Sequence, residues 1–207
     1  LWQNEGLQLT ESRLEKVDYS LRADKRGYAH ISYITKNLNS SNKFSVRYQA
    51  LTPYGKFLSD SLKGNLYSSN NTISETEIVP DGKSGSFVFW LENQNQKTLL
   101  CGQYVDSTGS KKWGKKPLTI SKTTSNVISY SVGKLGNSIY VAVTYQGTNK
   151  IVYQNLISDK GKFLWGNEGK LLTYQKGSQT NPQFSFIDSS VVVSWTNEFE
   201  KQKDVFI

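Results

Sequence analysis

The chain repeats one short motif at intervals of about 52 residues, and such a period restricts it to a repeat architecture. Each copy has a glutamine, a glycine six or seven residues later, and a tryptophan or serine four residues beyond the glycine. The glutamines are Gln49, Gln103 and Gln154, the glycines are Gly55, Gly109 and Gly161, and the last positions are Ser59, Trp113 and Trp165. This spacing indicates a tandem array of similar units.

The first residues of the chain supply a fourth, partial copy of the motif. Residues 1–6, Leu-Trp-Gln-Asn-Glu-Gly, match residues 164–169, Leu-Trp-Gly-Asn-Glu-Gly, so Trp2 corresponds to Trp165. The four copies predict a single domain over residues 1–207. Its approximate repeats are 1–50, 51–105, 106–157 and 158–207.

Each repeat is expected to contain four short β-strands, because short apolar runs alternate with turn residues and no helical period separates them. The first strands are expected directly after the motif, at 7–10, 65–68, 118–121 and 170–173. The second strands are expected at 16–23, 73–80, 127–132 and 182–187, and the third at 28–35, 86–92, 138–145 and 191–196. The fourth strand of each repeat carries the glutamine.

A four-stranded antiparallel unit of this length cannot bury both of its faces alone, whereas radial stacking of such units does. The sequence therefore predicts an all-β fold, a β-propeller of four-stranded antiparallel blades. A β-sandwich or another all-β array is the alternative. Residue 1 falls inside the motif and residue 207 where the next glutamine is due, so a partial ring of a larger propeller is expected.

The landmark residues are interpreted as scaffold. The glycines are expected to form a tight turn from the last strand of one repeat to the first strand of the next. Trp2, Trp113 and Trp165 are then expected to lie largely buried between adjacent sheets, where a large aromatic side chain stabilises their packing. The glutamines can satisfy backbone donors and acceptors at the same junction.

The motif resembles the tryptophan-docking repeat of quinoprotein-like propellers, and Thr108-Gly109 followed by Trp113 matches its second half. The aspartate usual in that repeat is absent, and its place is taken by Leu51, Val105 and Leu156. The pattern is also similar to repeats of large secreted or surface propellers of Bacteroidota-like bacteria. The resemblance implies a propeller fold and a secreted or cell-surface location, and it transfers no catalytic residue.

Two turns, at residues 106–109 and 158–161, are similar to the Asp-box of sialidase propellers. Sialidases require arginines from several blades to bind a carboxylate. The four arginines here all lie in the first repeat, at Arg13, Arg22, Arg26 and Arg47. Sialidase activity is therefore not expected.

Few residues offer catalytic or metal-binding chemistry. His30 is the only histidine and is expected to be a hydrogen-bonded structural residue, with a Ser-His-Asp triad as the alternative. The single cysteine, Cys101, excludes an internal disulfide and a cysteine zinc site. Paired carboxylates could support a glycosidase. The candidates are Glu75, Glu77, Glu92, Asp106 and Glu198, of which Glu75 and Glu77 are expected on one solvated strand face. No cofactor and no metal are expected.

The net charge of +8 comes mainly from lysines spread along the chain. Because arginine, the usual reader of bases, is scarce, nucleic-acid binding is not expected. The densest basic cluster is a weak candidate for an anionic ligand and consists of Lys111, Lys112, Lys115 and Lys116. No apolar run is long enough to span a membrane.

A clear repeat without a catalytic constellation predicts a function in binding. The sequence therefore favours a non-catalytic binding or scaffold module of a secreted or cell-surface bacterial protein, with a protein or glycan partner and no enzyme activity. The alternative is a glycan-binding or glycan-active propeller with glycosidase-like chemistry.

Overall fold

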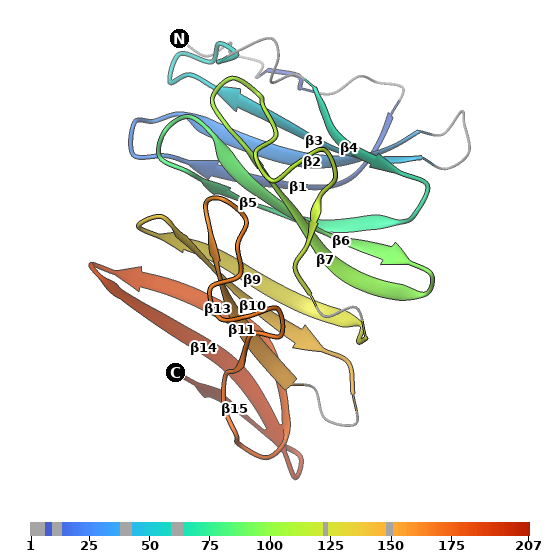
Figure 1. The fold of residues 1–207 in the computed structure, drawn as a ribbon, viewed down its shortest axis with the longest axis vertical. Coiled ribbons are helices and arrows are strands. Elements are labelled where there is room, and N and C mark those ends of the chain that lie inside the picture. Colours follow the sequence, from blue (N-terminus) through green and yellow to red (C-terminus); the bar gives the residue numbers. More distant parts are fainter. Residues whose placement is uncertain (1–6, 10–13, 38–42, 59–63, 122–123, 148–150) are drawn as a thin grey trace. The chain divides into compact units, whose positions relative to one another are not determined.

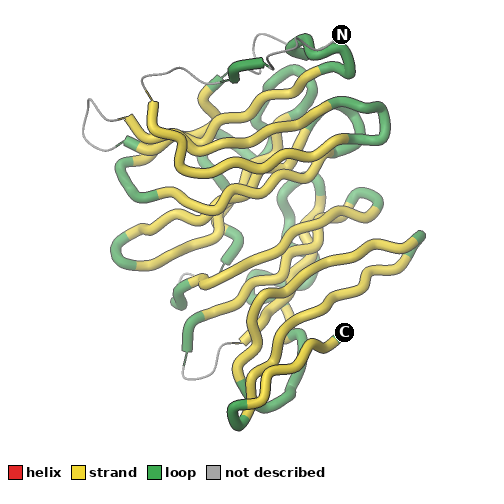
Figure 2. Tube along the Cα trace, turned by 180° about the vertical axis from the view of Figure 1, so that it is seen from behind, coloured by secondary structure: helices red, strands yellow, loops and turns green. Residues whose placement is uncertain are grey.

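The computed structural model describes residues 7–9, 14–37, 43–58, 64–121, 124–147 and 151–207, and its regular elements are all β-strands (Figures 1 and 2). The strands form four antiparallel sheets, each built from strands that are consecutive in the chain. The predicted all-β propeller of four-stranded blades is confirmed. Four strands were expected in the fourth sheet, and three of its strands lie among the described residues.

The first sheet comprises β1 (Leu14–Ala23), β2 (Ala29–Asn37), β3 (Phe44–Leu51) and β4 (Asn65–Ser69). The second comprises β5 (Ile73–Pro80), β6 (Ser86–Gln94), β7 (Lys97–Val105) and β8 (Leu118–Thr119). The third comprises β9 (Val127–Leu135), β10 (Ser138–Tyr145), β11 (Ile151–Ser158) and β12 (Lys170–Leu171). The fourth comprises β13 (Ser178–Ile187), β14 (Ser190–Phe199) and β15 (Gln202–Phe206).

The chain forms two compact units. The first contains Leu1–Gln94 and Cys101–Leu118, and the second contains Asn95–Leu100 and Thr119–Ile207. Within the first unit β5 packs against β1 and β2, and within the second unit β13 packs against β9 and β10. In each unit, therefore, the first strand of one sheet lies on the preceding sheet.

The core of each unit consists of aromatic and branched aliphatic side chains on the middle strands of its sheets. In β6 the seven consecutive residues from Ser86 to Glu92 are buried, so both faces of this strand are covered. The largest fully buried side chains of the first unit include Phe87, Phe89 and Trp90. In the second unit, Ile139 and Ile157 are fully buried. Burial on both faces is what stacked sheets require.

The strand that follows each motif belongs to the preceding sheet, which corrects the expectation that it opens the next one. β4 pairs with β3, and β12 pairs with β11. The glycine turn is therefore a hairpin within one sheet, and the repeat boundaries at 50/51, 105/106 and 157/158 fall before the last strand of each sheet. Residues 7–9, expected in a strand, are not in one, and residue 10 lies outside the described residues.

The hairpin has the same backbone geometry in all three complete copies of the motif. Gly55, Gly109 and Gly161 have φ of 76°, 86° and 77°, a region that glycine adopts without steric cost. Their amides donate to the carbonyl three residues earlier, at 2.9, 3.0 and 2.9 Å. This turn sends the chain back along the strand it has just left, which is why the following strand stays in the same sheet.

The packing of the second unit depends on a glycine where two sheets meet. A Cβ atom added at Gly133 in β9 would lie 2.2 Å from the Phe186 ring in β13. We expect Gly133→Ala to lower the free energy of unfolding by about 1–3 kcal/mol, the usual cost of overpacking, measured by urea denaturation. The control is Gly136→Asn in the β9–β10 turn, where the added side chain meets open space and asparagine tolerates φ of 60°. Equal stabilities of the two variants would contradict the prediction.

Candidate functional site

The motif tryptophans lie against strands of their own sheets. Trp113 has ring centroids 5.6 Å from Phe87 and 6.1 Å from Phe89, both in β6. Trp165 makes an edge contact with Tyr140 of β10 at 6.4 Å, and the Lys170 ammonium lies 5.2 Å from its ring centre. Both tryptophans are half-buried, and the hairpin folds each indole back onto its own blade. Their burial between adjacent sheets stays a prediction. Trp2 lies outside the described residues.

The motif amides tie the connection after the third strand to that strand. The Gln103 Nε2 donates to the carbonyl of Gly114 at 3.0 Å, while its Oε1 accepts from the backbone N–H of Trp113 at 2.9 Å. Gln49 is also buried, and its Nε2 donates to the Tyr33 hydroxyl at 3.1 Å. These contacts anchor the motif within its blade.

In the third copy the equivalent residue is Asn155, whose Nδ2 donates to the Gly166 carbonyl at 2.9 Å. It stands six residues before Gly161, the same spacing as between Gln103 and Gly109. The prediction from the sequence chose Gln154 because it has the same residue type as Gln49 and Gln103, although Asn155 has their spacing to the glycine. The side chain of Gln154 lies outside the described residues.

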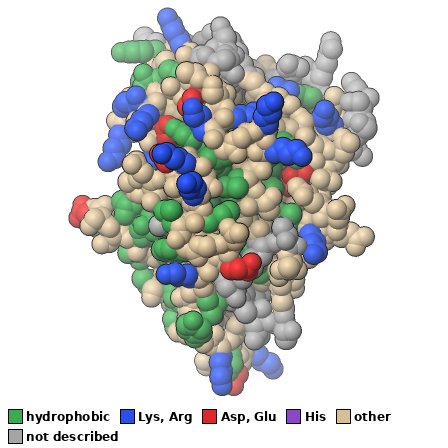
Figure 3. Space-filling model, in the orientation of Figure 1, with side chains coloured by type: hydrophobic (Ala, Val, Ile, Leu, Met, Phe, Trp, Pro, Cys, Tyr) green, Lys and Arg blue, Asp and Glu red, His purple; other side chains and the backbone are tan. Residues whose placement is uncertain are grey.

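The basic cluster is exposed, and one of its members is paired. Lys111, Lys112, Lys115 and Lys116 are all exposed, and basic side chains are interspersed with polar and hydrophobic ones on the face in Figure 3. The Lys112 Nζ lies 3.3 Å from the Asp106 Oδ2. The Asp106 Oδ1 accepts from the N–H groups of Thr108 and Ser110. Slight burial opposes ionisation, but these hydrogen bonds and Lys112 hold the pKa of Asp106 below its usual value. Asp106 is therefore a turn residue, and anion binding by the cluster stays a prediction.

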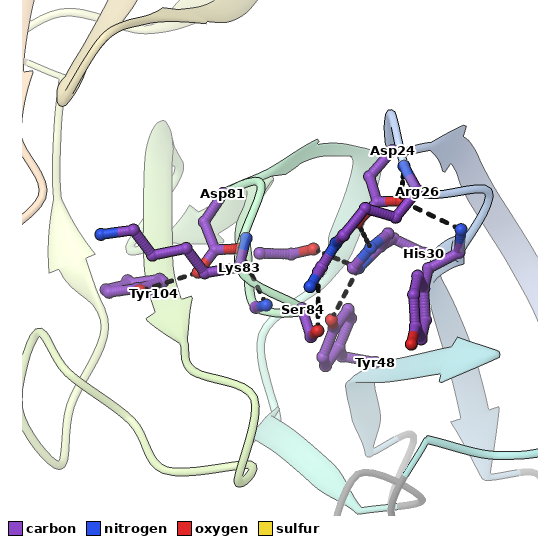
Figure 4. Close-up of polar contacts among 11 residues, drawn as sticks. Asp24, Arg26, His30, Tyr48, Asp81, Lys83, Ser84 and Tyr104 are labelled. Atoms are coloured by element: carbon purple, nitrogen blue, oxygen red, sulfur yellow. Dashed lines mark hydrogen bonds and ion pairs between the residues drawn. The ribbon is translucent and has the colours of Figure 1, made fainter. Parts of the chain in front are cut away.

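His30 lies at the centre of a buried polar cluster in the first unit (Figure 4). Its Nδ1 lies 3.0 Å from the Tyr48 hydroxyl and 2.9 Å from the Ser86 hydroxyl. Its Nε2 lies 3.6 Å from the Asp24 Oδ2, an ion-pair distance. Burial lowers the pKa of His30, and the charge of Asp24 opposes this in part. The predicted hydrogen-bonded structural histidine is confirmed.

The cluster joins the β1–β2 turn to the β5–β6 turn (Figure 4). The Arg26 guanidinium donates to the Asp24 Oδ2 at 3.1 Å and to the Ser84 hydroxyl at 2.7 Å. In the second turn, the Asp81 Oδ1 accepts from the Gly85 N–H at 2.9 Å, and its Oδ2 accepts from the Tyr104 hydroxyl at 2.9 Å. Both turns are thus held in place by side chains from neighbouring strands.

Ser86, His30 and Asp24 are the residue types of a hydrolytic triad, but they cannot act as one. Ser86 and His30 have 0% exposed surface, so no substrate carbonyl reaches the Ser86 hydroxyl. The 3.6 Å separation of His30 from Asp24 also exceeds a hydrogen bond. The cluster stabilises the packing of two sheets and is not the functional site.

Two of the candidate carboxylates have structural partners. Glu92 is buried, and its Oε1 accepts from the Asn71 amide at 2.9 Å while its Oε2 accepts from the Gln94 amide at 3.0 Å. The Glu77 Oε1 lies 3.9 Å from the Arg22 guanidinium. Glu92 is enclosed by neutral donors and is inaccessible to a substrate.

Each first strand of the four sheets carries a β-bulge. The ladder shifts between Lys16 and Asp18 in β1, and between Ser74 and Glu77 in β5. Corresponding shifts occur between Val127 and Ser129 in β9, and between Thr180 and Gln183 in β13. Bulges re-aim side chains and are over-represented next to active sites. This recurring position is therefore the place in the fold to search for chemistry.

Two interacting carboxylates lie at these bulges: Asp18 follows Val17, the extra residue of β1, and Glu75 is an extra residue of β5. The Asp18 Oδ2 accepts a hydrogen bond from the Thr76 N–H at 2.8 Å, which joins the two strands at their bulges. Partial burial, and secondly the negative charge of Asp18, raise the pKa of Glu75 above its usual value. The Glu75 side chain nevertheless keeps an exposed surface, and its backbone has φ of 51°. Asp18 is thus held by a backbone donor, while its neighbour Glu75 is biased towards the protonated acid.

Sequence reasoning missed Asp18 and misplaced Glu75. It treated Glu75 and Glu77 as alternating residues on one face of a regular strand, whereas the bulge between Ser74 and Glu77 breaks that alternation. Asp18 lies more than 50 residues from Glu75 in the chain, so only the packing of β1 against β5 brings them together. The signal available in the sequence was a carboxylate on each of two successive first strands.

Within the part of the chain that the structure describes, no three histidine, cysteine or acidic side chains are grouped so that they could hold a metal ion. In the same part, no helix has the length and apolar character needed to cross a membrane.

Comparison with known proteins yields structural likeness only. No family model matches the chain, and no curated protein matches its sequence significantly. A thermostable family-43 glycoside hydrolase is similar at 9% identity with a TM-score of 0.52, over 92% of this chain and 70% of that one. A family-43 endo-arabinanase from Bacillus licheniformis has 11% identity and a TM-score of 0.47, over 92% and 72%. An arabinanase from Bacillus subtilis has 10% identity and a TM-score of 0.45, over 86% and 66%.

These comparisons overturn two predictions from the sequence, that the chain is a non-catalytic adhesion or scaffold module and that it is no enzyme. The solved structure that shares the fold with a TM-score of 0.52 is a glycoside hydrolase, so this fold is not restricted to non-catalytic scaffolds. At 9% identity the likeness itself shows the fold alone. A catalytic role for this chain therefore depends on the carboxylates at its bulges.

The buried His30 makes stability depend on pH. Because its folded pKa is lowered from 6.5, the unfolded chain binds the proton more readily, and stability falls as pH decreases through 6.5 towards the folded value. We expect urea unfolding between pH 7.5 and 5 to show this loss, with a slope of at most about 1.4 kcal/mol per pH unit from this group. His30→Gln should remove that contribution. The same slope in both proteins would contradict it.

Proposed function

We propose that the chain is a carbohydrate-active propeller that cleaves glycosidic bonds with Asp18 and Glu75. The observation that supports this best is the pair of unlike carboxylates at the bulges of two packed first strands. Glycoside hydrolysis ordinarily requires two carboxyl groups, one that protonates the leaving oxygen and one that acts as an anion. The similarity of the fold to a family-43 glycoside hydrolase agrees with the proposal.

Glu75 suits the role of general acid. Its raised pKa favours the protonated form, and its exposed position allows contact with a substrate. A carboxyl group whose pKa is raised by its surroundings is the usual general acid in such sites. The proton would pass from the Glu75 carboxyl to the glycosidic oxygen as the bond to the anomeric carbon breaks.

Asp18 suits the role of the anionic partner. The hydrogen bond from the Thr76 N–H orients one of its oxygens. As a carboxylate, Asp18 can activate a water molecule or stabilise positive charge at the anomeric carbon. Thr76 is itself held, because its hydroxyl lies 2.9 Å from that of Ser32 and donates to the Phe89 carbonyl at 3.1 Å. The donor to Asp18 is therefore on a rigid segment.

The proposal predicts that removing either carboxylate abolishes hydrolysis. We expect Asp18→Asn and Glu75→Gln to lower kcat by roughly 100- to 10,000-fold, the usual contribution of acid–base groups. Reducing-end release from soluble polysaccharides and cleavage of aryl glycosides of pentoses and hexoses are the measurements. Glu77→Gln, on the same strand and paired with Arg22, is the matched control and should retain activity. An equal loss in the control, or no hydrolysis of any substrate by the natural chain, would contradict the proposal.

The pH dependence of the same reaction supplies a second test. Activity should fall on the alkaline side as Glu75 loses its proton, because the general acid must be protonated to act. Because the pKa of Glu75 is raised, the alkaline limb lies above the usual range for a glutamate. For an aryl glycoside with a good leaving group, Glu75→Gln should flatten the alkaline limb. A limb that remains unchanged in this variant would assign the proton to another group.

A further inference from the structure

The second unit contains a polar cavity of about 450 Å³ at the start of its first strands. The cavity lies beside the β14–β15 hairpin, and we call it the hairpin cavity. Its walls include Ile128 of β9, Thr180 and Asn181 of β13, and four charged residues of the hairpin. This volume falls within the range of small-ligand sites, about 300–1,000 Å³.

The hairpin cavity occupies the bulge position of the second unit. Ile128 is the extra residue at the β9 bulge, and Asn181 lies in the β13 bulge with φ of 53°. In the first unit the corresponding extra residues are Val17 of β1 and Glu75 of β5, and Asp18 follows Val17 directly. In the second unit Asn181 stands where Glu75 does and Ser129 where Asp18 does, so the bulges themselves carry no carboxylate there.

The charged residues that line the cavity include equal numbers of acidic and basic side chains. It consists of Glu198 of β14, Glu200 and Lys201 of the turn, and Lys203 of β15. All four side chains are exposed, and within the described residues none of them makes an ion pair with another group. Two carboxylates and two ammonium groups therefore face one space with their hydrogen-bonding capacity available.

We propose that the hairpin cavity is an accessory binding site for a neutral sugar unit. Sugar hydroxyls both donate and accept hydrogen bonds, which matches carboxylates, ammonium groups and the Asn181 amide together. A ligand with one sign of charge would meet two like charges in the wall, whereas a neutral ligand meets none. Ile128 supplies an apolar surface for the C–H face of a sugar ring. The choice of a sugar as ligand rests on the proposed function, while binding here needs no catalytic group.

The test measures binding without turnover. Isothermal titration uses the full chain carrying Glu75→Gln, with neutral cellohexaose and xylohexaose as probes and oligogalacturonate as the anionic comparison. Into this background we introduce Glu198→Ala with Lys203→Ala, a pair that leaves the net charge unchanged. The control pair, Lys160→Ala with Glu168→Ala, removes exposed charges of both signs elsewhere in the same unit. Glu200→Gln is a second, isosteric change at the cavity.

We expect a neutral oligosaccharide to bind, and the cavity pair to weaken its affinity on the order of tenfold or more, since hydrogen bonds to charged groups are lost. The control pair should leave affinity unchanged, and Glu200→Gln should weaken it in a chain of unaltered thermal midpoint. Equal affinity in cavity and control variants, binding of oligogalacturonate alone, or no binding at all would overturn the inference. Hydrolysis by the natural chain is measured separately, so loss of the cavity site and failure of the catalytic proposal give different results.

Discussion

The stacking of one sheet's first strand on the preceding sheet is the interaction on which the rest of the structure depends. A four-stranded sheet with apolar side chains on both faces is unstable in water until each face is covered. In the first unit, contacts such as Ser32 to Thr76 and His30 to Ser86 fix the relative position of two such sheets. Because these contacts are buried, an unpaired member would be costly, and they select a single packing register.

The same stacking explains why the candidate chemistry lies on first strands. These strands pack on a neighbouring sheet through one face and still present exposed side chains. A regular strand cannot place two adjacent residues towards the same space, but a bulge can. The extra residues include Val17 and Glu75 on one pair of strands, and Ile128 and Asn181 on the other. The fold thus repeats one backbone feature, and the side chains at it differ between the two units.

The motif and the chemistry occupy different parts of each blade. The glycine hairpin and its amide lie at the last two strands, where Gln103 and Asn155 hold the returning connection. The bulges lie on the first strand. Because they are separate, the side chains at the bulges can differ between copies that share the same motif contacts.

The sequence by itself determined the repeat, the all-β composition, the tight glycine turns and the structural nature of His30, because these follow from local spacing and from residue type. Tertiary structure alone decided that the motif hairpin stays within one sheet, that the Asn155 amide bonds to the Gly166 carbonyl, and that Asp18 meets Glu75. The pairing of a strand and the position of its bulge depend on the neighbouring strand. The two carboxylates, Asp18 and Glu75, are also distant from each other in the chain. No local pattern records which strand will pack on which, so the candidate site becomes visible only when the sheets are stacked.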